Sequence, residues 1–158
     1  SFYEFGYRSI IDQMIARVVE TEAPVRADVV AQRIARAHGW LRTGSRIRHK
    51  IELHLRAFDS TDDSAGRFIW PKGGIKEMVA YRPPATDEDR RAVTDIAIEE
   101  LVGFIRIYSK ALEEPDPPLV LARLMNLERL AASSRARIDE AILKAEEPHR
   151  RHQEIGKI

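Results

Sequence analysis

Cysteine is absent from this chain of 158 residues, which excludes a disulfide framework and any thiolate metal site. Such an absence is typical of cytoplasmic proteins, and we expect a cytoplasmic location. No apolar run approaches the roughly 18 residues that a membrane-spanning helix needs, so we expect no membrane partner. The first residues, Ser1-Phe2-Tyr3-Glu4, lack the basic start and the apolar core of a signal peptide. Because the chain does not begin with methionine, we expect it to be part of a longer protein.

The sequence also lacks the usual constellations of catalytic residues. It has no phosphate-binding loop, since Lys72-Gly73-Gly74 is too short to be one, and no His-Glu-x-x-His metal motif. Adjacent acidic pairs such as Glu99-Glu100 diverge from each other, and we expect them on a solvated helix surface. The sequence therefore predicts a chain without enzymatic activity, metal, cofactor or small-molecule ligand.

Positive charge is concentrated in one part of the chain. The net charge is only +1, yet residues 26–56 hold eight basic residues against two acidic ones, Asp28 and Glu52. A local basic patch on a nearly neutral protein indicates a specific anionic partner. A solvated helix face explains the same charges, and the charge pattern alone does not choose between the two.

The spacing of apolar residues predicts a mainly α fold that opens with three helices, at about 9–22, 26–38 and 43–58. Gly39 is placed to cap the second helix. After the third helix we expect a polar loop at 59–66, a strand at 67–70, a turn at 72–74 and a returning strand at 78–82. Three helices and a β-hairpin wing predict a winged helix-turn-helix domain over residues 8–83.

The remainder of the chain is predicted to be helical. Further helices at about 95–112, 118–126 and 133–147 form a subdomain over residues 84–147, packed on the first domain, and residues 148–158 form a flexible tail. A shift of 87 residues aligns the two halves, with five identities over 24 positions that include Arg48 with Arg135 and Ile51 with Ile138. This pattern suggests a degenerate repeat, but two unrelated amphipathic helix pairs explain it equally well.

The helix at 43–58 carries the predicted binding surface. With Ile51 and Leu55 facing inward, Ser45, Arg46 and His49 face outward. In a helix-turn-helix the N-terminal part of this helix enters the major groove, while basic side chains hold the phosphates. The predicted nucleic-acid contacts, wing included, are Arg42, Thr43, Ser45, Arg46, Arg48, His49, Lys50, Arg67 and Lys72. Winged helices also serve as protein-interaction modules, which is the alternative function.

Several of these segments match a known family in their order along the chain. They are Glu-Ala-Pro-Val at 22–25, Arg-Ile-Ala-Arg-Ala-His-Gly at 33–39, Arg-Thr-Gly-Ser-Arg-Ile at 42–47, Phe-Ile-Trp at 68–70, Arg82, and Glu-Glu-Leu at 99–101. Over roughly residues 8 to 145 the chain resembles a bacterial domain-of-unknown-function family found at the C-terminal end of very large superfamily I helicase-related proteins. The resemblance implies an accessory domain that binds duplex or junction DNA, with the helicase core elsewhere in the same parent chain as its partner.

Overall fold

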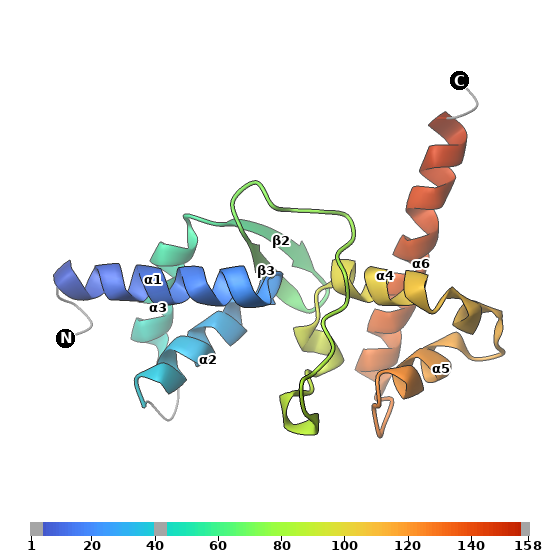
Figure 1. Cartoon of the computed structure of the whole chain (residues 1–158), viewed down its shortest axis with the longest axis horizontal. Helices are drawn as coiled ribbons and strands as arrows, with labels where there is room; N and C mark the ends of the chain where they lie inside the picture. The colour runs from blue at the N-terminus through green and yellow to red at the C-terminus, as the bar shows by residue number, and fades with distance from the viewer. Residues whose placement is uncertain (1–4, 40–43, 156–158) are drawn as a thin grey trace. The chain divides into compact units, whose positions relative to one another are not determined.

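A computed structural model describes the backbone of residues 5–39 and 44–155, and the side chains of 9–39, 44, 45 and 48–147. The fold is mainly helical with a small antiparallel sheet of three strands (Figure 1). The chain divides into two compact units, Ser1–Ile75 and Lys76–Ile158. Within the described residues, no helix combines the length and apolar character that crossing a membrane requires.

Three helices and three short strands make up the first unit. The helices are α1 (Phe5–Glu22), α2 (Ala27–Ala37) and α3 (Ser45–Leu55), close to the three predicted from apolar spacing. The strands are β1 (Val25–Arg26), β2 (Asp59–Asp63) and β3 (Gly66–Trp70), in the sheet order β1-β3-β2. The core of the unit lies between the inner faces of the helices and β3, with Ile15, Val19, Val30, Ile34 and Ile51 among its fully buried side chains.

The prediction of a polar loop at 59–66 is wrong, because Asp59–Asp63 is a strand. It pairs with β3 from Asp59 opposite Trp70 to Asp63 opposite Gly66, which leaves a hairpin loop of two residues. The Thr61 hydroxyl accepts a hydrogen bond of 2.9 Å from the buried Trp70 indole, and the Asp59 carboxylate accepts one from the Gly73 amide. Pairing to an apolar strand therefore overrides the low strand propensity of this acidic segment.

The returning strand predicted at 78–82 does not form, and the hairpin lies one segment earlier, at β2 and β3. Residues 78–82 instead belong to the second unit, where they run along the start of α4 (Ile98–Ile107). The Val79 amide donates to the Glu99 carbonyl at 3.2 Å, and the Arg82 amide donates to the Glu100 carboxylate at 2.9 Å. The two units consequently divide at residue 75, before the domain boundary at 83 that the sequence suggested.

In the part of the second unit that the structure describes, the regular elements are helices and 3-10 turns, joined by irregular segments. After α4 come α5 (Pro117–Leu124) and α6 (Ala132–Ile155), with three short 3-10 turns, η1 (Asp87–Asp89), η2 (Val93–Asp95) and η3 (Ser109–Glu113). α4 packs mainly on α6, and buried side chains of both helices share one core with α5. α6 continues beyond Glu147 through Pro148, where the sequence predicted a flexible tail.

Glu100 is buried in this core, contrary to the solvated position predicted for the Glu99-Glu100 pair. Its carboxylate binds the Arg91 guanidinium and the Arg82 amide, and these partners compensate the cost of burying its charge. The backbone at Val79 crosses α4 so closely that a Cβ added to Gly103 would lie 1.9 Å from the Val79 carbonyl oxygen. Glycine at position 103 therefore permits this crossing.

Candidate nucleic-acid interface

Helix α3 presents one buried face and one exposed face, as its sequence predicts. Ile51 and Leu55 are 1% and 3% exposed and pack into the core of the first unit. Ser45 and His49 are exposed on the other side of the helix, and the exposed Arg48 flanks that side. The burial of Ile51 fixes the helix phase, since each residue turns the helix by about 100°. The outward face of the first two turns is therefore polar and available to a ligand.

The candidate contact residues fall into three groups in the structure. Arg42, Thr43 and the side chain of Arg46 lie outside the described residues. Ser45, Arg48, His49 and the half-buried Lys50 lie together on the first two turns of α3. The other two, Arg67 on β3 and Lys72 in the turn after it, lie in the hairpin region of the same unit.

Arg48 is the exposed arginine nearest the start of α3 among the described side chains. Its Nη1 lies 3.8 Å from an Asp28 carboxylate oxygen at the start of α2, a separation longer than a hydrogen bond. Both side chains are about half exposed, at 50% and 55%. A contact of this length between exposed groups is weak, so a phosphate can take the place of Asp28 at little cost.

Other residues of the basic segment, Arg33 and His54, hold the helices together instead. Arg33 donates from Nε and Nη2 to the Glu22 carboxylate at 3.1 Å, which ties α2 to α1. His54 forms a hydrogen bond with Asp12, which ties α3 to α1. The positive charge counted in the sequence is thus divided between a structural set and an exposed set.

The hairpin is less basic than the sequence suggested. Arg67 is paired with Glu52 on α3 and lies opposite Asp62 on β2. Strand β2 also brings Asp59 and Asp63 into the hairpin. Lys72 is exposed in the following turn. Because carboxylates repel phosphates, the outward face of α3 suits an anionic ligand better than the hairpin does.

Among the described side chains of the basic segment 26–56, two exposed arginines were missing from the predicted contacts. Arg36 lies in the last turn of α2, and Arg56 caps the C-terminus of α3. The helix phase derived from Ile51 places Arg56 on the outward side. The spacing of apolar residues in the sequence was therefore sufficient to predict its exposure.

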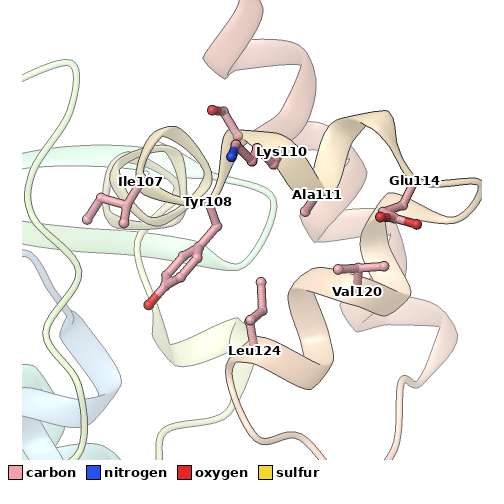
Figure 2. Close-up of a pocket in the computed structure, with 8 residues that line it drawn as sticks. Ile107, Tyr108, Lys110, Ala111, Glu114, Val120 and Leu124 are labelled. Carbon is pink, nitrogen blue, oxygen red and sulfur yellow. The ribbon is translucent and has the colours of Figure 1, made fainter.

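The second unit carries an apolar pocket of about 370 Å³, shown in Figure 2. Its lining includes three large apolar side chains that are exposed, Ile107 at 66%, Tyr108 at 42% and Leu124 at 44%. Lys110 and Glu114 add one charge of each sign. No group of three or more metal-ligating side chains lies close together in the described part of either unit.

Comparison with known families finds a match in the first unit. Residues 1–49 match a family model described as "Protein of unknown function (DUF3320)". The matched part spans α1, α2 and the beginning of α3. No curated protein and no solved structure matches the chain. Over residues 1–49 the chain is therefore similar to a family of unknown function, as the motifs at 22–25, 33–39 and 42–47 suggested.

Proposed function

We propose that the first unit is a non-catalytic module that binds nucleic acid through the outward face of α3. The observation that carries this proposal is the exposure of Ser45 and His49 on the outward side of the first two turns, with the exposed Arg48 flanking them. Arginine suits both phosphate and guanine, because its planar guanidinium donates two parallel hydrogen bonds. Free amide groups at the start of α3 favour an anion at the same end of the helix.

The order of elements supports a winged helix-turn-helix as the fold of this unit. Three helices are followed by a hairpin, and β1 adds a third strand beside β3. The connection between α2 and α3 contains Gly39, whose φ of 71° is the left-handed conformation that commonly ends a helix. In this fold the third helix is the one that enters the major groove, which agrees with the exposed face of α3.

The family resemblance supports a role next to a helicase-type motor. We propose that this chain positions duplex or junction DNA for a helicase core of the same parent protein, which supplies the ATPase. The chain itself is then free of ATPase and nuclease activity. Measurable ATP turnover by the purified chain, absent from a mock preparation, would contradict this part of the proposal.

Fluorescence anisotropy with the full chain tests nucleic-acid binding directly. Labelled duplex, forked and single-stranded DNA are titrated at 20, 50, 100 and about 200 mM salt, where phosphate contacts weaken progressively. We expect dissociation constants on the order of micromolar or weaker, as for non-specific DNA binding. Arg48→Gln should weaken binding and lower the salt slope by about one.

Arg106→Gln is the matched control, since Arg106 is an exposed arginine on α4 of the second unit. It removes the same charge and should leave the affinity close to that of the unmodified chain. Absence of binding to all three probes at the lowest salt concentration would refute nucleic-acid binding.

A protein-interaction module that docks the motor onto a partner is the second candidate function. The apolar pocket at Ile107, Tyr108 and Leu124 favours it, because exposed apolar clusters often mark contacts between proteins. Leu124→Ser then weakens partner binding in a pull-down from the native host, whereas Arg48→Gln does not.

A further inference from the structure

The helices α5 and α6 repeat the local structure of α2 and α3 at a spacing of 87 residues. α2 ends at Ala37 and α5 at Leu124, while α3 begins at Ser45 and α6 at Ala132. The two connections between helices consequently have the same length. The shift of 87 residues comes from sequence identities alone, so this agreement of helix ends is an independent observation.

The turn after the first helix has the same backbone conformation in both pairs. Gly39 has φ 71° and Asn126 has φ 60°, and among the described residues Asn126 is the one non-glycine with positive φ. The Gly39 amide donates to the Arg36 carbonyl at 3.0 Å, and the Asn126 amide donates to the Arg123 carbonyl at 3.0 Å. Glycine and asparagine are the residues that best tolerate this left-handed conformation.

The first turn of the second helix and the buried positions also correspond. The Arg48 amide donates to the Gly44 carbonyl at 3.0 Å, and the Arg135 amide donates to the Ala131 carbonyl at 2.9 Å. Four buried pairs are related by the same shift, namely Ala31 with Pro118, Ile34 with Leu121, Ala35 with Ala122, and Ile51 with Ile138. The equivalence therefore extends through both helices of each pair.

Arg48 and Arg135 occupy equivalent positions but have different surroundings. Each reaches an aspartate at the start of the preceding helix, Asp28 in the first pair and Asp116 in the second. Arg135 donates from Nη1 and Nη2 to the two Asp116 oxygens at 2.7 and 3.1 Å, whereas Arg48 lies 3.8 Å from Asp28. The bidentate geometry makes the second contact the stronger one.

Neighbouring positions on α6 have lost the basic residues found on α3. Ser133 stands where α3 has Arg46, and Ala136 where it has His49. Arg137, equivalent to Lys50, is buried and donates to the carbonyls of Val93 at 3.1 Å and Ile96 at 2.7 Å.

We infer that α5 and α6 are a diverged duplicate of the α2–α3 helix-turn-helix, in which the arginine equivalent to Arg48 has become a positioning residue. Arg135 holds the start of α5 against the first turn of α6 through Asp116. The duplicate does not bind nucleic acid, and binding by the whole chain comes from the first unit alone. The assignment of Arg48 rests on the proposed function; the duplication does not.

Paired variants of the full chain separate the roles of the two arginines. Arg48→Gln should lower the salt slope of DNA binding by about one, with unchanged hydrogen exchange in α5 and α6. Arg135→Gln should leave DNA binding unchanged and accelerate hydrogen exchange in peptides from both helices. Weaker DNA binding by Arg135→Gln, or unchanged exchange in α5, would overturn the inference.

A second set of variants tests the duplication without relying on nucleic acid. The exchanges Gly39→Asn and Asn126→Gly should preserve the unfolding midpoint, because both residues adopt positive φ. Gly39→Val and Asn126→Val should both lower it, since a β-branched residue is strained in this conformation. Unchanged midpoints for either valine variant would contradict the shared turn. If the unmodified chain binds no DNA, the proposed function fails, while these variants still test the turn conformation that the two helix pairs share.

Discussion

Arg91 binds the buried carboxylate of Glu100 with both terminal nitrogens of its guanidinium. Nη1 donates to Oε1 at 3.0 Å and Nη2 donates to Oε2, while Nη2 also donates to the Arg82 carbonyl at 2.6 Å. The Arg82 amide donates to the same carboxylate. One ion pair thus joins the segment around Arg82, the residues before α4, and the first turn of α4 itself.

Removal of the Glu100 carboxylate should destabilise the second unit strongly. Glu100→Ala leaves the Arg91 side chain, only 16% exposed, without its charge partner. We expect a loss of about 3–5 kcal/mol in the free energy of unfolding, as is usual when one member of a buried pair is removed. Urea unfolding followed by circular dichroism measures it, with the exposed Glu128→Ala as control. A loss equal to that of the control would mean that the pair contributes little.

Alanine at position 103 should destabilise α4, although alanine normally favours a helix over glycine by about 1 kcal/mol. The added Cβ would meet the Val79 carbonyl oxygen at 1.9 Å. Because this oxygen belongs to the backbone, either α4 or the segment at Val79 would have to shift. We expect a net loss of about 1–3 kcal/mol or more, as for overpacked sites. Thermal unfolding of Gly103→Ala measures the change, and a stabilised variant would contradict the close crossing.

The phase of α3 is tested by one buried and one exposed position. Ile51→Ala should cost about 2–5 kcal/mol, because it opens a cavity in the core of the first unit. His49→Ala should change stability by less than about 0.5 kcal/mol, as surface substitutions usually do. Chemical denaturation of both variants provides the comparison. Similar losses for the two would mean that the outward face is assigned wrongly.

The Asp116–Arg135 pair should make stability depend on acid pH. Hydrogen bonding to Arg135 lowers the pKa of the Asp116 carboxyl below its usual value of about 3.9. Because the folded-state pKa is lowered, the contribution to stability is present above about pH 4 and is lost as pH falls through the folded value. The stability difference between the unmodified chain and Asp116→Asn should therefore shrink between pH 5 and about pH 2.

Thermal unfolding across this range measures that difference, with the exposed Glu128→Gln as a control of the same charge change. A difference that stays constant down to pH 2 would indicate that the Asp116 charge contributes nothing to the pair.

Local periodicity was enough to predict the helices and the exposed face of α3. The apolar spacing of Ile51 and Leu55 defines the buried side of a helix, and Gly39 supplies the positive φ that ends the preceding one. Both signals involve residues within a few turns of one another. The sequence also showed the shift of 87 residues between the two helix pairs, but five identities did not decide whether the second pair is a repeat.

Only the tertiary structure decided which charged residues are structural and where the hairpin lies. Asp59–Asp63 becomes a strand because β3 offers it a partner, and Arg67 turns toward Glu52 because the sheet brings it beside α3. Glu100 is buried because Arg91 and the Arg82 amide reach it from another segment. The apolar pattern of a sequence predicts which face of a helix is buried. The free energy of burying or pairing a charge depends instead on groups that folding brings from elsewhere in the chain.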